Sequence, residues 1–400
     1  MLTLDDARRQ LLDRVSPAEG EAIALADAAG RVLVEPRVIA RVDVPPFANS
    51  AMDGYAIRAA DAPGPLTLTG EIAAGAAELP AVTAGTAVRM MTGAPMPPGA
   101  DSVVPLEEAV EAVEGVTVPG SVQPGAHVRA AAHDTRAGDE ICLPGALTPA
   151  GIAVLASLGI GSVDVRRRPV VAVLSTGDEL AGPGQALRPG QIHDANSPAL
   201  AAAVVEAGGQ PLTLARAGDE RGAIERALAD AAARADLVVT SGGVSVGRHD
   251  HVREVLEERG QLGFWRIAVQ PGKPLAVGEL DTTTVIGLPG NPVSALVTFE
   301  LFVRPFIRAA LGLSGDGRLH LRARPEARIE KDAARRAFLR VVVRQDGTEL
   351  RARAAGGQAS SQLRPMANAN ALLVVPEGAD GAEPDRSYEV IMLGPVAEGS

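Results

Sequence analysis

The chain has 400 residues, 46% of them hydrophobic, which is enough to build roughly two to four domains with cores of their own. Its 49 acidic residues outnumber its 38 Lys and Arg residues, so the formal net charge is −11, and aromatic residues make up only 2%. This composition argues against nucleic-acid binding, which relies on basic stripes and aromatic stacking platforms.

Signals for export, membrane insertion and disulfide formation are lacking. A single cysteine, Cys142, cannot form an internal disulfide. No apolar run reaches the roughly 20 residues that cross a bilayer, and the N-terminus lacks the basic and apolar segments of a signal peptide. We therefore expect a cytoplasmic protein that does not associate with membranes.

The first part of the chain predicts one helix followed by a mostly β region. Thr3 can cap a helix that runs to about Val15, because Leu4, Ala7 and Leu11 recur at helical spacing. Between about residues 39 and 136, short β-type runs alternate with Pro and Gly. These runs are Leu66–Thr69, Ala87–Met91, Ser102–Pro105 and Gly115–Val118, and helical character returns over Thr148–Leu158.

Residues 168–311 alternate between apolar strands and helices, which predicts a doubly wound parallel sheet covered on both faces. The predicted strands are Val170–Leu174, Pro211–Ala215, Asp236–Thr240, Phe264–Val269 and Thr284–Leu288. The predicted helices are Pro198–Ala207, Glu220–Arg234, Asp250–Arg259 and Pro292–Leu311. After the linker 312–317, β-type runs predict a small barrel or sandwich: Leu319–Arg324, Phe338–Val343, Glu349–Arg353, Leu372–Val375 and Tyr388–Leu393.

Three glycine-rich loops follow predicted strands and should meet at the carboxyl edge of the sheet, where doubly wound folds bind ligands. They are Ser175–Leu180, Thr240–Gly247 and Gly287–Ser294. Gly242, Gly243 and Gly247 let the backbone approach an anion, and Asn291-Pro292 suits the start of a helix whose free amides can receive a phosphate. Each loop alone could equally be an ordinary tight turn.

Charged residues accompany these loops. Glu179 with Asp178, Asp219 and Asp250 follow or lie near strand ends, and carboxylates facing phosphates predict a Mg²⁺ site. The alternative for Asp219 and Asp250 is helix capping, because both stand at predicted helix starts. Lys273, one of two lysines, lies in the rigid turn Gln270–Pro274, where it can meet a phosphate or another oxyanion; a solvated loop lysine is the alternative.

By these motifs the chain resembles the molybdopterin molybdenumtransferase family, which includes the gephyrin E domain. The resemblance covers nearly the whole chain, and the α/β part alone is also similar to molybdopterin adenylyltransferases. It is carried by these segments: Pro45–Tyr55, Arg89–Pro97, Arg168–Leu180, Gln191–Asn196, Ser241–Gly247, Pro271–Pro274, Gly287–Ala295 and Gly356–Ser360.

The resemblance implies an α/β plus β multidomain fold and an elongated homodimer. Residues 1–40 with 138–166 would form an extended linking domain, 41–137 a mostly β domain, 167–312 a molybdopterin-binding α/β domain, and 317–400 a C-terminal β-barrel-like domain. The active site would lie between the α/β domain of one subunit and the β domain near Asp53 of the other. With a divalent metal present, adenylated molybdopterin and molybdate would react to give molybdenum cofactor and AMP. The partners that the resemblance implies are molybdopterin adenylyltransferase and acceptor molybdoenzymes.

The residues expected in the site combine the motif analysis with the resemblance. Asp53, Glu179, Asp219 and Asp250 are the expected catalytic residues, and we expect the last three to position Mg²⁺ and the attacking water or molybdate oxygen. The expected substrate-binding residues are Thr92, Arg129, Asp134, Ser175, Gly177, Ser241, Gly242, Gly243, Ser245, Gly247, Arg266, Lys273, Pro289, Gly290, Asn291, Pro292 and Ser360.

The sequence departs from the family pattern near the predicted anion site. Arg266 and Gln270 stand where the family usually has lysines, so Lys273 is expected to carry more of the positive charge, and His193 replaces a more usual tyrosine or charged residue. A molybdopterin adenylyltransferase, a non-catalytic cofactor-binding scaffold and a tungstate-specific enzyme remain alternatives. The Asp53 segment and the C-terminal β region argue against the first, and the retained acids argue against the second.

Overall fold

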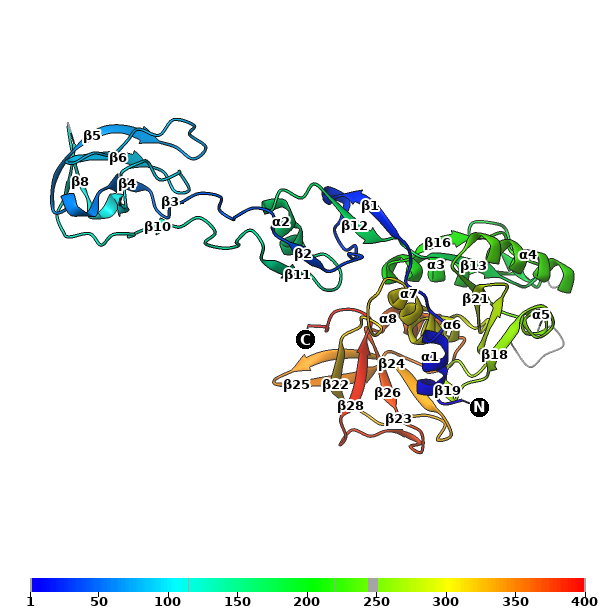
Figure 1. Ribbon diagram of the computed structural model, residues 1–400. Coiled ribbons are helices and arrows are strands. Elements are labelled where there is room, and N and C mark those ends of the chain that lie inside the picture. Colours follow the sequence, from blue (N-terminus) through cyan, green and yellow to red (C-terminus); the bar gives the residue numbers. More distant parts are fainter. Residues whose placement is uncertain (1, 114, 219, 244–250, 399–400) are drawn as a thin grey trace. The chain divides into compact units, whose positions relative to one another are not determined.

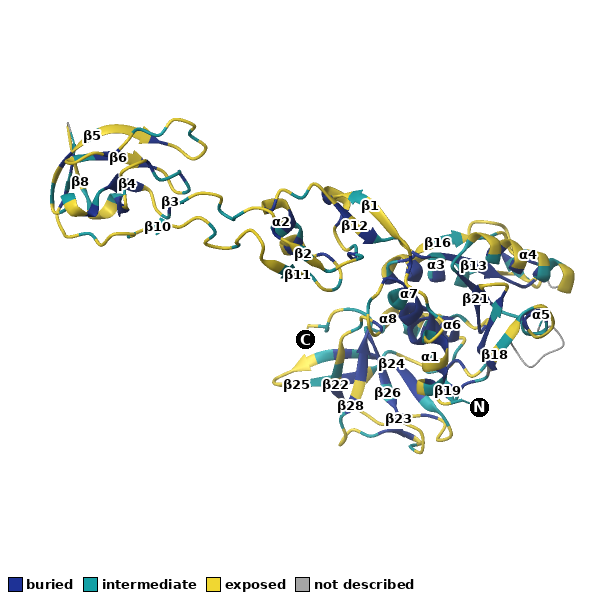
Figure 2. Ribbon diagram, in the orientation of Figure 1, coloured by how far each residue is buried: buried dark blue, intermediate teal, exposed yellow. Residues whose placement is uncertain are grey.

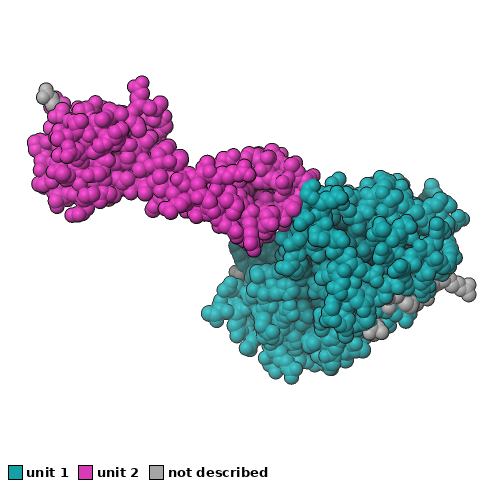
Figure 3. Space-filling view, in the orientation of Figure 1, with its two compact units in different colours: residues 1–20, 166–400 teal, residues 21–165 magenta. Residues whose placement is uncertain are grey.

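The computed structural model describes residues 2–113, 115–218, 220–243 and 251–398. It divides into two compact units, one made of residues 1–20 with 166–400 and the other of residues 21–165 (Figure 3). In the described ranges, no helix has both the length and the apolar character needed to cross a membrane.

The smaller unit contains a twisted sheet with the strand order β7-β4-β6-β5-β9-β8 (Figure 1). Alternate residues of its strands face opposite sides: Tyr55 and Ile57 join one hydrophobic cluster, whereas Ala56 joins the other. The bounds are β4 (Gly54–Ile57), β5 (Gly64–Ile72), β6 (Thr86–Met90), β7 (Ser102–Pro105), β8 (Val110–Ala112) and β9 (Gly115–Val118), so the four predicted β runs are confirmed.

The rest of this unit brings together two segments that are far apart in the sequence. Strands β1 (Gly20–Ala24) and β2 (Arg37–Ile39) pair with β12 (Ser162–Arg166) and β11 (Glu140–Cys142), and β3 (Asn49–Ser50) pairs with β10 (Val128–Arg129). Helix α2 (Pro149–Ser157) begins where Thr148 accepts the N–H of Gly151, and its Leu155 is buried in a cluster shared with Leu25 and Val165. Short 3₁₀ turns occupy Leu25–Asp27, Ala59–Asp61 and Leu106–Glu108.

The larger unit begins with α1 (Leu4–Leu12), which Thr3 caps as predicted. Its α/β part is a sheet with the order β16-β13-β17-β21-β20-β18. The bounds are β13 (Val170–Ser175), β16 (Gln210–Thr213), β17 (Leu237–Ser241), β18 (Gln261–Trp265), β20 (Ala276–Leu280) and β21 (Thr283–Leu288). All residues of β17 are buried, and so are all residues of β21 (Figure 2), because helices cover both faces of the sheet.

Two expectations for this sheet were wrong. The sheet is mixed, because β20 and β18 pair antiparallel at one edge, and β20 was missed. The predicted strand Phe264–Val269 is broken into β18 and β19 (Val269–Gln270), since Arg266 adopts a left-handed backbone with φ of 73° that no strand accommodates.

Helices α4 (Arg221–Arg234) and α5 (His251–Arg259) pack on one face of the sheet, and α3 (Asn196–Ala207), α6 and α7 cover the other (Figure 1). The predicted helix Pro292–Leu311 is continuous but not uniform. It comprises α6 (Pro292–Thr298), a π-helical turn at Phe299–Val303 and α7 (Arg304–Ala310). Two short strands, β14 (Leu180–Ala181) and β15 (Ile192–His193), pair beside the carboxyl edge of the sheet.

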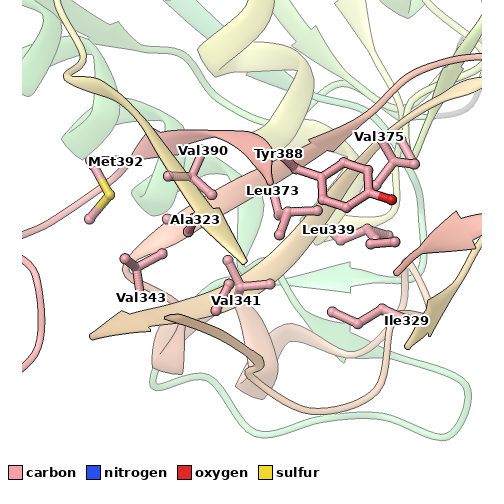
Figure 4. Packing of buried hydrophobic residues seen from close by; sticks show 14 residues of the cluster. Ala323, Ile329, Leu339, Val341, Val343, Leu373, Val375, Tyr388, Val390 and Met392 are labelled. Atoms are coloured by element: carbon pink, nitrogen blue, oxygen red, sulfur yellow. The ribbon is translucent and has the colours of Figure 1, made fainter. Parts of the chain in front are cut away.

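The C-terminal region is a closed barrel. Strand β24 (Arg336–Asp346) pairs with both β25 (Glu349–Ala354) and β26 (Ala371–Val375), and β22 (His320–Pro325) and β28 (Tyr388–Met392) complete the ring. Leu339, Val341, Leu373 and Val390 fill the interior (Figure 4). The remaining elements are β23 (Ile329–Glu330), β27 (Gly381–Ala382) and α8 (Leu363–Asn368). Of the two predicted alternatives for the C-terminal region, the structure therefore shows the barrel and not the sandwich.

A charged cluster ties the α/β part to the barrel. Arg318, just before β22, donates hydrogen bonds to Glu300 at 2.9 Å and to Glu206 at 2.7 Å, and Arg304 also binds Glu300 at 2.7 Å. His320 lies between the carboxylates of Asp316 and Glu389, at 3.0 and 2.6 Å. Helix α3, the π turn and the first barrel strand are thus held together by ion pairs.

Candidate functional site

The three glycine-rich loops meet at one edge of the sheet, as predicted. Strands β13, β17 and β21 are parallel neighbours, so their carboxyl ends lie side by side. The N–H of Thr176 donates to the carbonyl oxygen of Ser241, and a Cβ on Gly290 would lie only 3.7 Å from Cα of Gly242. The backbones of the three loops are therefore in contact.

A cavity of about 590 Å³ opens between these loops. Of the residues predicted for the site, it is lined by Gly177, Glu179, Ser241, Gly242, Gly243, Gly290, Asn291 and Pro292. Its remaining lining residues are Thr176, Leu180, Ile192, His193, Asp194, Ala195, Asn196 and Ile224. Gly242 and Gly243 have φ values of 96° and 70°, a left-handed conformation that glycine adopts without strain. The cavity thus combines loop backbone, hydroxyls and the two acidic residues Glu179 and Asp194.

Glu179 is the acidic residue of the first loop that reaches the cavity. Its carboxylate lies directly against Gly177, where any Cβ would collide with it. Gly177 also has a φ of 137°, which a side chain would strain. The carbonyl oxygen of Glu179 accepts the N–H of Ile192 at 2.8 Å, so the main chain is fixed at this point. The neighbouring Asp178 turns toward Gly218 instead.

Asn196 and Asp194 are cavity residues that the sequence analysis did not assign to the site. Nδ2 of Asn196 donates to Ser241 Oγ at 2.6 Å and to the carbonyl oxygen of Gly290 at 2.8 Å. Asp194 accepts the N–H groups of Asn196 and Ser197 and the hydroxyl of Ser197. An Asp-x-Asn-Ser-Pro run at a helix start could have indicated the cap but not the reach of Asn196 to two other loops.

A second cavity, of about 320 Å³, lies between the α/β part and the barrel. The predicted residues Lys273, Pro289, Asn291 and Ser360 line it, together with Gln270, Pro271, Gly272, Pro274, Ser294, Arg335, Gln358 and Ala359. Nδ2 of Asn291 donates to Ser360 Oγ at 3.1 Å. Asn291 occupies the capping position of α6 but makes no side-chain cap on that helix.

Arg335 is the second cation beside Lys273 in this cavity, and no local signal in the sequence marked it. Asp332 fixes its side chain through Nη2 and Oδ2 at 2.7 Å. The N–H of Asp332 in turn donates to Oε1 of Gln270 at 3.0 Å. Gln270 thus holds the barrel loop that carries Arg335.

Three further residues that the sequence analysis named differ in whether they line a cavity. Ser175 is buried and shares a hydrogen bond of 2.5 Å with Ser197, so it lies outside the lining of both cavities. Arg266 also lines neither, and its N–H donates to the carbonyl oxygen of Leu275. His193 lines the first cavity, and its Nε2 lies 2.9 Å from the carbonyl oxygen of Gln185.

The four site residues expected in the smaller unit all lie at its surface. Asp53 Oδ1 accepts the N–H of Thr92 at 2.6 Å and its hydroxyl at 2.9 Å, and these hydrogen bonds lower the pKa of Asp53. Arg129 is exposed in β10 and pairs with Asn49 of β3. Asp134 is exposed, and its N–H donates to Val44. The Asp53 and Thr92 segments are therefore joined.

Asp219, Ser245, Gly247 and Asp250 lie outside the described residues. Of the expected metal ligands, only Glu179 has a described position, at the first cavity. In the part of the chain that the structure describes, no three His, Cys, Asp or Glu side chains gather into a group that could hold a metal ion.

Three family models match the chain in consecutive order. The "MoeA N-terminal region (domain I and II)" matches residues 2–159, the "Probable molybdopterin binding domain" residues 172–309, and the "MoeA C-terminal region (domain IV)" residues 322–393.

Relatives of similar length match as well. "Molybdopterin molybdenumtransferase 2" of Mycobacterium tuberculosis is 39% identical over 94% of this chain and 96% of its own length. A "Molybdopterin molybdenumtransferase" of Haemophilus influenzae is 42% identical over 78% of each chain. A crystal structure of a molybdopterin biosynthesis MoeA protein from Pyrococcus horikoshii superimposes with a TM-score of 0.84, at 30% identity, over 99% of this chain and 100% of that one.

Proposed function

Because the chain belongs to the MoeA family of molybdopterin molybdenumtransferases, we propose that it transfers molybdenum from molybdate to adenylated molybdopterin and releases AMP. The observation that carries this proposal is the end-to-end match to relatives with this name, which spans both flanking β regions as well as the α/β part. A molybdopterin adenylyltransferase resembles the α/β part alone, so it is the less favoured reading.

In this proposal the first cavity receives the phosphoanhydride of the adenylated substrate. The left-handed glycines Gly242 and Gly243 let the loop backbone approach phosphate oxygens closely. The N–H of Gly242 already donates to the carbonyl oxygen of Leu288, so Gly243 is the donor that we propose. Mg²⁺ fits the residues present, since it needs only one or two protein carboxylates besides phosphate oxygens. Glu179 would be one ligand, and Asp219 and Asp250 are the further ligands that we propose. When bound, the ion would neutralise charge on the phosphate oxygens.

We assign molybdate to the second cavity. Molybdate is a dianion, and Lys273 and Arg335 supply two cations, with the hydroxyl of Ser360 as a hydrogen-bond donor. Asn291 lines both cavities, so the loop before α6 would lie between the phosphoanhydride and the oxyanion. In this arrangement the chain contributes placement and charge, on which phosphoryl chemistry mainly depends.

The finer expectations complete the proposal. We propose Asp53, whose pKa the hydrogen bonds from Thr92 lower, as a further catalytic residue, with Thr92, Arg129 and Asp134 as substrate-binding residues. We also propose a cytoplasmic homodimer that exchanges substrate and product with an adenylyltransferase and with acceptor molybdoenzymes. Sedimentation equilibrium would test the dimer.

The reaction is tested by incubating the full chain with adenylated molybdopterin and Mg²⁺, with and without molybdate. The proposal expects AMP release that depends on molybdate. Pyrophosphate formed from ATP and free molybdopterin would favour the adenylyltransferase, and tight binding of substrate without AMP release would favour a non-catalytic scaffold. Replacing molybdate by tungstate in the same assay separates the two metals.

A further inference from the structure

The carboxyl edge of the sheet carries two hydroxyl side chains on the face that α3 covers, and both have hydrogen-bond partners. Ser175 shares a hydrogen bond of 2.5 Å with Ser197. Ser241 accepts a hydrogen bond of 2.6 Å from Asn196. Ser197 and Asn196 both belong to the start of α3, so the two hydroxyls on this face are satisfied.

The opposite face carries Thr240 and Thr176, because side chains alternate along a strand. Thr240 follows Val238 by two residues in β17, and Val238 belongs to the core cluster that contains residues of α4 and α5. A Cβ on Gly243 would lie 3.4 Å from Oγ1 of Thr176 and 2.9 Å from Val252 of α5. Thr176 therefore lies on the same face of the sheet as Thr240.

Neither of these threonine hydroxyls has a hydrogen-bond partner in the part of the chain that the structure describes. Thr240 has no accessible surface, whereas Thr176 is 7% exposed and lines the first cavity. Thr240 lies opposite Leu174 in the ladder of β17 with β13. Thr176 follows Leu174 by two residues, so it lies one step nearer to the cavity than Thr240, on the neighbouring strand.

A buried hydroxyl without a partner lowers stability, because it loses its hydrogen bonds to water and gains none in return. Thr283, in β21, shows the usual arrangement: it is also buried, and its hydroxyl donates to the carbonyl oxygen of Ala232 at 3.0 Å. Valine has the shape of threonine without the hydroxyl, so it would fill the position of Thr240 without this cost. The unpaired hydroxyl of Thr240 therefore requires an explanation from what occupies the cavity beside it.

We propose that Thr240 is a positioning residue that acts through Thr176 on a phosphate group in the first cavity. The hydroxyl of Thr176 donates to a phosphate oxygen, and its own oxygen accepts the hydroxyl of Thr240. The two hydroxyls then form a chain in which each hydrogen bond strengthens the other, and no proton leaves either residue. This inference rests on the proposed function, which assigns the phosphoanhydride to this cavity.

The test measures the Kd of AMP, with Mg²⁺ present, for the full chain by titration calorimetry. Thr240→Val removes the hydroxyl and keeps the shape, whereas Thr240→Ser keeps the hydroxyl. We expect Thr240→Val to raise the Kd about tenfold and Thr240→Ser to raise it less than about threefold. Thr176→Val should raise the Kd at least as much as Thr240→Val. The double variant should bind no more weakly than Thr176→Val alone, because the chain of hydroxyls is already broken.

Thr283→Val is the matched control, because Thr283 is a buried threonine of the same sheet that lines neither cavity. It should lower the unfolding temperature, since the Ala232 carbonyl loses its donor, and leave the Kd of AMP within about twofold. Thr240→Val should instead unfold at or above the wild-type temperature when no ligand is present. A merely structural role of Thr240 would give a lower unfolding temperature in Thr240→Val as well.

Four results contradict the inference. They are a wild-type Kd in Thr240→Val, a Thr240→Ser protein that binds as weakly as Thr240→Val, additive losses in the double variant, and a Thr240→Val protein that unfolds below the wild-type temperature or fails to fold.

The two proposals can fail separately. If the wild type binds AMP but releases none from adenylated molybdopterin with molybdate, the proposed reaction fails, and the Kd values still decide the role of Thr240. If the wild type releases AMP and Thr240→Val binds AMP as the wild type does, only the role of Thr240 fails. A wild type that does not bind AMP contradicts the role of Thr240 as well.

Discussion

The side-chain amide of Asn196 donates a hydrogen bond to the hydroxyl of Ser241 across 2.6 Å, which joins the start of α3 to the loop after β17. The same amide donates to Gly290 in the loop after β21. One side chain therefore fixes the spacing of two of the loops that form the first cavity.

We expect Asn196→Ala to lower the free energy of unfolding by about 1–2 kcal/mol, because it leaves a hydroxyl and a carbonyl without their partner. The affinity of the Asn196→Ala protein for AMP should also fall, because the loops lose their spacing. Urea denaturation and AMP titration measure the two effects. Gln191→Ala, which removes a hydrogen bond to the N–H of Arg188 outside the cavity, is the control. Equal losses in both variants would argue against a specific role of Asn196.

Gly177→Ala tests whether the glycine is needed to seat Glu179. A methyl group there would push against the Glu179 carboxylate and strain a φ of 137°. We expect molybdate-dependent AMP release to fall by at least tenfold. Gly184→Ala provides the control, because Gly184 also has a positive φ, of 82°, but a Cβ would meet nothing within 4 Å. If the two variants lose activity equally, backbone strain alone is the cause.

Thr92 sets the ionisation of Asp53. Its N–H and hydroxyl both bind the carboxylate and lower the pKa of Asp53. The carboxylate consequently stays ionised to lower pH than an ordinary aspartate, and what it contributes to stability is lost as pH falls through its folded pKa. Thr92→Val keeps the backbone N–H, which is the larger cause of the lowered pKa, and removes the hydroxyl. Carboxyl NMR should therefore show the pKa of Asp53 raised part of the way toward that of an ordinary aspartate, whereas Thr92→Ser should leave it low. An unchanged pKa in Thr92→Val would assign the whole effect to the backbone N–H.

His320 makes the stability of the barrel depend on pH. Burial alone would lower the pKa of His320, but its hydrogen bonds to Glu389 and Asp316 outweigh burial and raise it. Stability from this cluster is therefore complete below the unfolded pKa of about 6.5 and is lost as pH rises through the folded pKa.

The measurement compares unfolding of the wild type and His320→Asn between pH 5.5 and 9. The two should differ most at the acid end and converge at the alkaline end. His193→Asn is the control, because the described partner of His193 Nε2 is a carbonyl oxygen instead of a carboxylate. A difference between wild type and His320→Asn that grows with pH would contradict the account.

Much of the fold could be predicted because local signals and burial agree. The apolar runs at Val170–Leu174 and Asp236–Thr240 become buried central strands, and Thr3 and Thr148 cap the helices that follow them. Arg266 shows the limit: an apolar β-type run does not reveal a left-handed residue that breaks the strand.

Only some of the residues that line the cavities could be predicted from the sequence. Glycine loops after parallel strands must meet at one edge, so Gly177, Gly242 and Gly290 could be placed together from the sequence. Arg335 could not, because its position depends on how the barrel docks on the α/β part. No short motif encodes such contacts between distant segments.

The central claim is tested most directly by AMP release in a single turnover, measured with and without molybdate for wild type, Glu179→Gln and Glu19→Gln. Glu19 is an exposed glutamate that lines neither cavity, so it controls for loss of one negative charge. We predict molybdate-dependent release in wild type and Glu19→Gln, and a rate at least 100-fold lower in Glu179→Gln. AMP release by Glu179→Gln at the wild-type rate would contradict the assignment of the first cavity as the reaction site.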